Sequence, residues 1–194
     1  MSSLRRVCVY CGSSDSVRPA YLEAAGAMGR AMAARGLTLV FGGGGTGLMG
    51  AVADAAMAAG GSVVGIIPEG FNTPALAHTH VTEMRVVGSM HERKALMAEM
   101  GDAFVALPGG FGTFEELFEI LTWAQIGLHA RPVGVLNALG YFDPLLALIE
   151  HAREEGFIYD EHRALLIEEA EPELLLDRLA TFQSPRGLER WVKR

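Results

Sequence analysis

Short apolar runs alternate with longer helical patterns along this chain, and that alternation constrains its fold more than any other sequence feature. The runs are rich in β-branched residues, which is typical of buried strands. We predict strands at Val7–Tyr10, Thr38–Phe41, Ser62–Ile67, Ala103–Leu107 and Pro132–Leu136. Apolar residues at helical spacing predict the intervening helices at Tyr21–Ala34, Leu48–Ala59, Met90–Met100, Thr113–Ile126 and Tyr141–Glu155.

The predicted strands are apolar throughout rather than at alternate positions, so both faces of the sheet should be buried. This indicates a single α/β domain over residues 1–194, a doubly wound, mostly parallel, Rossmann-like sheet with helices on both faces. The longest irregular stretch, Pro68–His80, is predicted to be a mobile loop near the ligand. After Ile158 the pattern becomes acidic and helical, and roughly the last ten residues, ending in the basic Arg190–Arg194, should form a peripheral tail.

The composition excludes several classes of protein. A formal net charge of −7 argues against general nucleic-acid binding, which needs many positive groups to neutralise phosphates. No apolar run approaches the roughly 20 residues of a membrane span, and Met1–Arg6 leads into a strand without the pattern of a secretory signal. We therefore expect a soluble cytoplasmic protein that binds neither nucleic acid nor a membrane.

The cysteines and histidines do not predict a metal site. Cys8 and Cys11 are the only cysteines and form a C-x-x-C, a motif that supports redox chemistry where it opens a helix. Here they lie within and at the end of a predicted strand, which favours two buried thiols, and no second pair completes a metal site. His78 and His80 also lack a third ligand at suitable spacing.

Two glycine-rich loops follow predicted strands, at the sheet edge where parallel α/β folds bind ligands. The first is Gly42–Gly50 and the second is Pro108–Thr113. Glycines allow close approach of the backbone, and a helix N-terminus supplies N–H donors and partial positive charge, so phosphate is the predicted ligand. The turn Cys11–Ser14 should open on the same edge, where the hydroxyl of Ser13 either completes the anion site or serves only as a helix cap.

The first loop also has the G-x-G-x-x-G spacing of dinucleotide-binding folds, at Gly42, Gly44 and Gly47. That fingerprint normally follows the first strand, and an acidic residue at the end of the next strand holds the ribose. Glu69 is the candidate for that role here, but it lies beyond Pro68. Neither loop ends in the Gly-Lys-Ser/Thr of a nucleoside triphosphatase. A nucleoside monophosphate suits the loops better than a dinucleotide or a triphosphate.

Charged residues near the two loops are candidates for catalysis. Arg93, in the first turns of a predicted helix, offers a planar fork of donors to phosphate or ribose oxygens, or else belongs to a solvated helix face. Glu116 has capping-box spacing from Thr113 and could simply cap the helix. A carboxylate at a helix N-terminus should have a lowered pKa, which suits an anionic partner for an oxocarbenium-like sugar or a base for water.

The second loop resembles a known family. Residues 108–116 match the P-G-G-x-G-T-x-x-E motif of the Lonely Guy (LOG) family of cytokinin riboside 5′-monophosphate phosphoribohydrolases. The resemblance runs through nearly the whole chain and includes the Cys11–Ser13 turn, Gly42–Gly50, Met90–Lys94 and the Thr122–Trp123 pair. It implies a homodimer without a metal or organic cofactor.

By this resemblance Arg93 and Glu116 are the catalytic pair. The predicted substrate-binding residues are Ser13, Gly43, Gly44, Gly47, Lys94, Gly109, Gly110, Phe111, Gly112, Thr113, Phe114, Glu115 and Thr122. One departure is Ala75, where many relatives have a substrate-contacting glutamate that Glu69 or Glu83 could replace. Relatives have also been called lysine decarboxylases, a label we reject because the only lysines are Lys94, beside the arginine, and Lys193, in the tail.

The predicted reaction is hydrolysis of the N-glycosidic bond of adenosine or N6-prenyladenosine 5′-monophosphate to the free base and ribose 5-phosphate. His91, Glu92, a backbone group or solvent could protonate the departing base. The alternative is a non-catalytic nucleotide or cofactor carrier of the same Rossmann-like fold.

Overall fold

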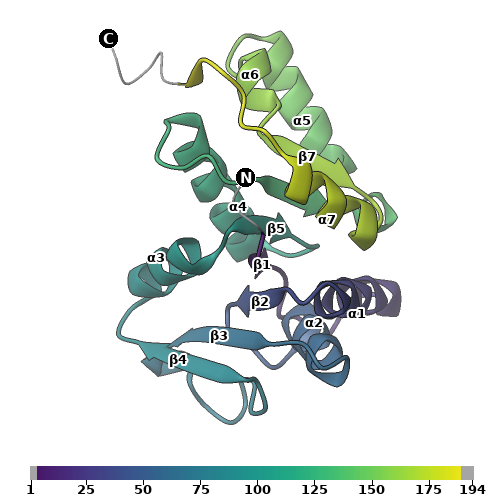
Figure 1. Ribbon diagram of the computed structural model, residues 1–194, viewed down its shortest axis with the longest axis vertical. Helices are drawn as coiled ribbons and strands as arrows, with labels where there is room; N and C mark the ends of the chain where they lie inside the picture. Colours follow the sequence, from purple (N-terminus) through teal and green to yellow (C-terminus); the bar gives the residue numbers. More distant parts are fainter. Residues whose placement is uncertain (1–3, 189–194) are drawn as a thin grey trace.

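Seven parallel strands form one sheet at the centre of the computed structural model, which describes residues 4–188 (Figure 1). The spatial order is β4-β3-β2-β1-β5-β6-β7, and every pairing is parallel. The order reverses beside β1, because β2 to β4 extend to one side and β5 to β7 to the other. The strands are β1 (Arg6–Tyr10), β2 (Thr38–Phe41), β3 (Val63–Pro68), β4 (Glu83–Val87), β5 (Ala103–Ala106), β6 (Val133–Leu136) and β7 (Leu166–Glu169).

Helices cover both faces of this sheet, as predicted for a doubly wound α/β fold. Helices α1, α2 and α7 pack on one face, and α3, α4 and α5 pack on the other. Their bounds are α1 (Pro19–Ala34), α2 (Gly47–Ala58), α3 (Met90–Met100), α4 (Phe111–Gln125), α5 (Asp143–Glu154), α6 (Asp160–Arg163) and α7 (Pro172–Thr181), with the short 3-10 turns η1 (Glu69–Phe71) and η2 (Ala138–Gly140).

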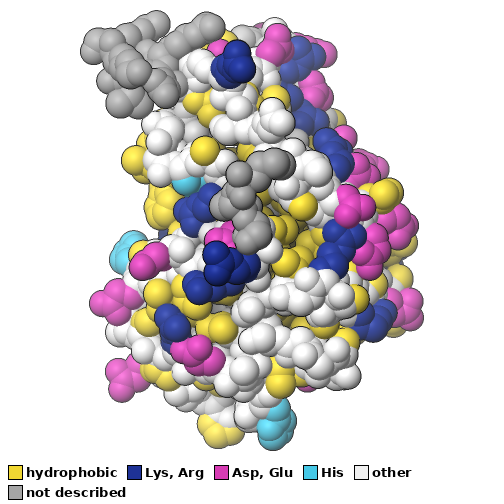
Figure 2. Space-filling view, in the orientation of Figure 1, with side chains coloured by type: hydrophobic (Ala, Val, Ile, Leu, Met, Phe, Trp, Pro, Cys, Tyr) yellow, Lys and Arg dark blue, Asp and Glu magenta, His cyan; other side chains and the backbone are white. Residues whose placement is uncertain are grey.

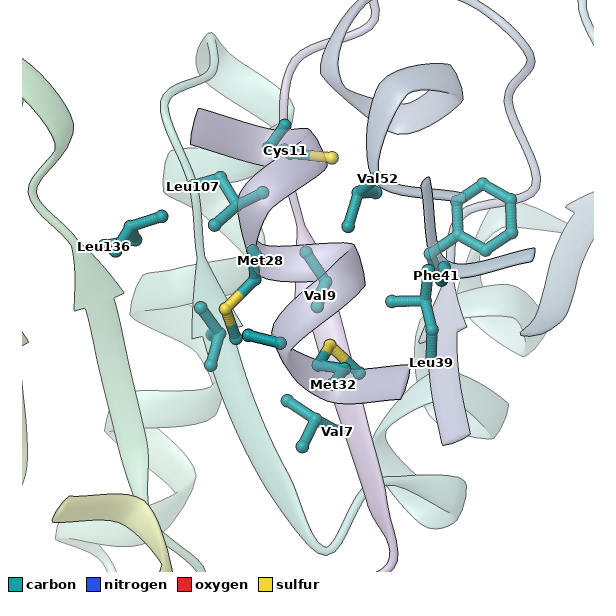
Figure 3. Close-up of a cluster of buried hydrophobic side chains, with 14 of the residues drawn as sticks. Val7, Val9, Cys11, Met28, Met32, Leu39, Phe41, Val52, Leu107 and Leu136 are labelled. Carbon is teal, nitrogen blue, oxygen red and sulfur yellow. The ribbon is translucent and has the colours of Figure 1, made fainter. Parts of the chain in front are cut away.

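The two faces of the sheet explain why the central strands are apolar throughout. In β1, Val7 and Val9 point into the layer under α1 and α2, whereas Cys8 and Tyr10 point into the layer under α3 and α4. All four side chains are buried. Figure 3 shows the first layer, in which Val7, Val9, Leu39 and Phe41 lie around Met28 and Met32 of α1.

Two strands were not predicted from the sequence. Strand β4 lies at one edge of the sheet and pairs only with β3. Its side chains are exposed or only partly buried, so its apolar signal is weak. Strand β7 lies at the opposite edge and ends in Glu168 and Glu169. The prediction that the chain is helical after Ile158 was therefore wrong for Leu166–Glu169. Edge strands need less apolar sequence because one side of each faces solvent.

The predicted tail is only partly described. Arg190–Arg194 lies outside the described residues, whereas Leu188 is buried beside Ala124 and Leu165. Within residues 4–188, no helix is both long enough and apolar enough to cross a membrane. On the face shown in Figure 2, Lys and Arg side chains are interspersed with Asp and Glu and form no continuous basic patch.

Candidate active site

A cleft of about 820 Å³ opens at the carboxyl ends of the strands, where the strand order reverses. The turn after β1 and the loop after β5 meet here, since the N–H of Gly12 donates to the carbonyl of Pro108 at 3.0 Å. Reversal points of this kind are the usual ligand sites of open α/β sheets because neighbouring loops diverge there. The cleft is lined by segments that follow β1, β2, β3, β5 and β6 and by the first turns of α3 and α4.

Several N–H groups of the first glycine loop donate to partners inside the protein. The carboxylate of Asp15 accepts from the N–H of Gly47 at 2.8 Å, and the carbonyl of Gly12 accepts from the N–H groups of Leu48 and Met49. The N–H of Gly45 donates to a carbonyl of the loop after β3 at 2.8 Å. A carboxylate at the start of α2 would repel a second anion, so this loop shapes the cleft wall and offers no pyrophosphate site of the dinucleotide type.

The second glycine loop leaves its donors free. Gly110 precedes α4 as its N-cap and no side chain caps that helix, so the N–H groups of the first turn face the cleft without a protein partner among the described residues. Thr113 is buried on the same turn, and its hydroxyl fills the space beside Gly109 that a Cβ would need. These features make the start of α4 the anion-binding end of the cleft.

Arg93 is held in the cleft by the start of α3. Ser89 caps this helix by accepting from the N–H of Glu92 at 3.1 Å, and the Glu92 carboxylate accepts in turn from Gly88 at 2.7 Å. The Arg93 side chain is 8% exposed, and its Nε donates to the carbonyl of Ile66 at 3.2 Å. The capped turn therefore directs a buried guanidinium to the floor of the cleft.

Glu116 lies opposite Arg93 and accepts a hydrogen bond from its guanidinium at 2.8 Å. Burial raises the pKa of Glu116 above its usual range, and the adjacent Arg93 charge opposes this rise without cancelling it. The expectation of a lowered pKa was therefore wrong, because burial outweighs the helix N-terminus. The capping-box interpretation was also wrong: the N-cap is Gly110, and the Glu116 carboxylate bonds across to α3.

The structure brings most, but not all, of the predicted site residues to the cleft. Ser13, Gly44, Arg93, Lys94, Gly109–Thr113, Glu115 and Glu116 line it. The others do not: Gly43 and Gly47 face the protein interior, Phe114 packs into the layer under α4, and the Thr122 hydroxyl donates to the carbonyl of Phe118.

Other lining residues were not predicted. Gly42, Met49, Phe71, Leu76, Met90 and Tyr141 form much of the apolar wall. Of these, Gly42 belongs to the glycine run that the sequence made visible, whereas Tyr141 carries no local signal that could have marked it.

Several residues considered from the sequence lie away from the cleft. His91, Glu92 and Glu69 are exposed and do not line it, and Glu83 pairs with Arg85 on β4 at 2.7 Å. Neither Glu69 nor Glu83 therefore supplies to the cleft the carboxylate that many relatives have at the position of Ala75.

The two thiols and the imidazole of His78 are buried inside the fold. Cys8 and Cys11 are buried free thiols, and burial raises the pKa of each well above its ordinary value, which suppresses thiolate chemistry. The ring of His78 contacts Asp54 at 3.0 Å and accepts from the N–H of His80. Residues 4–188 contain no group of three or more His, Cys, Asp or Glu side chains that could hold a metal ion.

Comparisons with known proteins match the sequence of this chain to a family. A cytokinin riboside 5′-monophosphate phosphoribohydrolase of Rhodococcoides fascians is 52% identical over 84% of this chain and 83% of that protein. A probable cytokinin riboside 5′-monophosphate phosphoribohydrolase of rice (Oryza sativa subsp. japonica), LOGL9, is 49% identical over 93% of this chain and 80% of that protein. This chain belongs to the LOG family. The family model that matches residues 49–179 carries the description "Possible lysine decarboxylase".

The lysine geometry of this LOG family member does not fit decarboxylation. The Lys94 ammonium pairs with Glu115 at 2.5 Å and with Glu119 at 3.1 Å. The hydrogen bond that Lys94 donates to Glu115 raises the pKa of Lys94, which favours the protonated amine, and a protonated amine cannot attack a carbonyl carbon. Lys94 instead connects α3 to α4 beside the Arg93–Glu116 pair.

Solved structures confirm the fold of this LOG family chain. The molybdenum cofactor binding protein of Rippkaea orientalis superposes with a TM-score of 0.69, covering 91% of this chain and 96% of that protein, at 21% sequence identity. At that identity the likeness concerns the fold alone.

Proposed function

We propose that this chain hydrolyses the N-glycosidic bond of cytokinin riboside 5′-monophosphates to the free base and ribose 5-phosphate. The observation that carries the proposal is the buried Arg93–Glu116 pair on the floor of the cleft. Glu116 belongs to α4, the helix whose uncapped N-terminus faces the cleft. An anion site and a reactive carboxylate are what a phosphoribosyl substrate requires at its two ends.

The spacing along α4 suits a ribose phosphate. Glu116 lies about six residues, or roughly 9 Å of helix rise, beyond Gly110, and helical side chains lean toward the N-terminus. A 5′-phosphate on the N–H groups of Gly110–Gly112 therefore brings the sugar, with C1′ at its far side, toward the Glu116 carboxylate. The Arg93 guanidinium lies on the same side and can donate to ribose oxygens.

Charge explains the chemistry we assign to the pair. As the bond from C1′ to the base nitrogen breaks, positive charge develops on the ribose, and an ionised Glu116 stabilises it or accepts a proton from the attacking water. Arg93 favours the ionised form of Glu116, since its charge lowers the pKa that burial has raised. Water then adds to C1′, and the departing base takes up a proton.

The apolar wall of the cleft supports an N6-prenylated base. Met49 lies in the first turn of α2, Phe71 and Leu76 follow β3, and Met90 begins α3. Phe71 and Leu76 are about half exposed without a ligand and would be covered by an apolar substituent. We therefore expect isopentenyladenosine 5′-monophosphate to be cleaved more efficiently than AMP.

The decisive experiment measures base released from isopentenyladenosine 5′-monophosphate and from AMP by the purified protein. Glu116→Gln should abolish release while nucleotide still binds, whereas Glu154→Gln, an exposed position on α5, should behave as wild type. Tight nucleotide binding without any release by the wild type would instead identify a carrier.

We also propose that the chain forms a homodimer. Phe111, which lines the cleft at the start of α4, Phe118 within the helix and Ile126 at its C-cap are exposed at helical spacing, at 94%, 42% and 40% respectively. A second copy of this chain could bury such a stripe, as the LOG resemblance leads us to expect.

A further inference from the structure

A tyrosine outside both glycine loops contacts the backbone of the second one. Tyr141 follows η2, lines the cleft, and donates a hydrogen bond from its hydroxyl to the carbonyl oxygen of Gly109. Its ring packs edge-on against Tyr21 and Phe142, with centroid separations of 5.7 and 5.1 Å. The hydroxyl therefore reaches this carbonyl from a packed position.

The turn before Tyr141 is held in a strained shape. Leu139 has a φ of 54°, in the left-handed region that a leucine rarely adopts. The Asn137 side chain donates to Asp143 at 2.7 Å and accepts from the N–H of Phe142 at 2.7 Å. These bonds hold the turn closed and fix the position of the Tyr141 backbone.

The peptide that Tyr141 contacts joins two glycines, so local sequence alone does not fix its orientation. A peptide flip changes ψ of the first residue and φ of the second, and glycine tolerates both signs of φ. Gly110 has a φ of −102°, and a Cβ built on it would meet nothing within 4 Å. A flip would carry this φ to a positive value, which costs glycine little.

The two orientations of this peptide present opposite charges. The C=O and N–H of a trans peptide point in opposite directions. While Tyr141 holds the Gly109 carbonyl, the N–H of Gly110 points away from Tyr141 and adds to the donors at the start of α4. After a flip, the carbonyl dipole would replace that donor and repel an anion.

We propose that Tyr141 is a positioning residue for the 5′-phosphate: its hydroxyl holds the Gly109–Gly110 peptide in the orientation whose N–H faces the ligand. The inference rests on the proposed function for the identity of the ligand and extends it to a residue beyond the glycine loops. Tyr141 acts on the phosphate through the peptide and takes no part in breaking the glycosidic bond.

The test compares Tyr141→Phe with wild type, because this change removes the hydroxyl and keeps the ring. The KM for isopentenyladenosine 5′-monophosphate and the Kd for ribose 5-phosphate should each rise about five- to tenfold, the effect of one hydrogen bond. We expect kcat to change less than about twofold, because the catalytic pair is untouched. Tyr159→Phe, outside the cleft, is the control for losing a phenolic hydroxyl and should change none of these values.

A second variant separates positioning from general loosening. Gly110→Ala disfavours positive φ at the residue that would flip, so it should hold the peptide in place without Tyr141. The loss of ribose 5-phosphate affinity caused by Tyr141→Phe should then shrink to less than about twofold in the Gly110→Ala background. The same loss in both backgrounds, or unchanged affinity in Tyr141→Phe, would overturn the proposal.

Ribose 5-phosphate binding also distinguishes this inference from the proposed function. Its affinity is measured without turnover, so a wild-type protein that binds it but releases no base would contradict the enzyme. The effect of Tyr141→Phe on that affinity would still decide the role of the tyrosine.

Discussion

Arg93 and Glu116 are 23 residues apart in the chain and meet at 2.8 Å on the floor of the cleft. Each side chain is only 8% exposed, so each charge depends on the other for much of the stabilisation that water would otherwise give. A buried pair of this kind adds little net stability, because desolvation offsets its attraction. Its position in the cleft supports the catalytic role that we propose for it.

The pH dependence of activity should reflect the raised pKa of Glu116. If the ionised carboxylate is the active form, kcat/KM rises as the pH increases through that pKa, and the acidic limb lies above the usual range of a glutamate. Arg93→Ala removes a charge that lowers this pKa, so the limb should move to higher pH. Arg93→Lys keeps a charge and should give an intermediate shift. The pH profile of base release measures both shifts, and a limb that stays in place in Arg93→Ala would contradict the pairing.

Gly42 is predicted to be essential because it makes room for Arg93. A Cβ at this position would come within 1.8 Å of a guanidinium nitrogen of Arg93. Gly42→Ala should displace that side chain and lower kcat by about 100-fold, the usual effect of misplacing a catalytic group by about 1 Å. Gly70→Ala is the matched control, since a Cβ there meets nothing within 4 Å. Both changes are followed by steady-state kinetics, with circular dichroism to verify the fold.

Asp15 should stabilise the protein by capping α2. Its carboxylate accepts from the N–H of Gly47 at 2.8 Å, at the positive end of that helix. Asp15→Ala should lower the free energy of unfolding by about 1 kcal/mol, as for other lost helix caps. Asp15→Asn keeps an acceptor oxygen and should lose less. Urea denaturation monitored by circular dichroism measures the difference, and equal stability of all three proteins would count against the cap.

The homodimer proposal makes a prediction about α4. Phe118→Arg places a charge in the exposed stripe, where burial against a second copy would be costly. Sedimentation velocity should show a dimer for wild type and a monomer for this variant. Leu174→Arg, at an exposed apolar position on α7, is the control and should remain dimeric. If the wild-type protein sedimented as a monomer, the proposal that the exposed stripe on α4 is a dimer interface would be wrong.

Much of the fold and part of the site were predictable from local sequence. The central strands are buried on both faces and are therefore apolar throughout, which made β1, β2, β3, β5 and β6 visible. The glycine runs after β2 and β5 indicated where a ligand would bind, because few other structural needs call for so many glycines in succession. Edge strands β4 and β7 lacked this signal, since each has solvent on one side.

The sequence by itself determined the order of the five central strands and the helices between them, the two glycine loops and the candidacy of Arg93 and Glu116. The tertiary structure decided which loop keeps free N–H donors, because Asp15 occupies the first loop only once the turn after β1 packs beside it. It also decided that burial raises the pKa of Glu116 and that Tyr141 meets Gly109. These outcomes depend on contacts between residues distant in the chain, and hydrogen-bond partners and desolvation are set by such contacts rather than by local sequence.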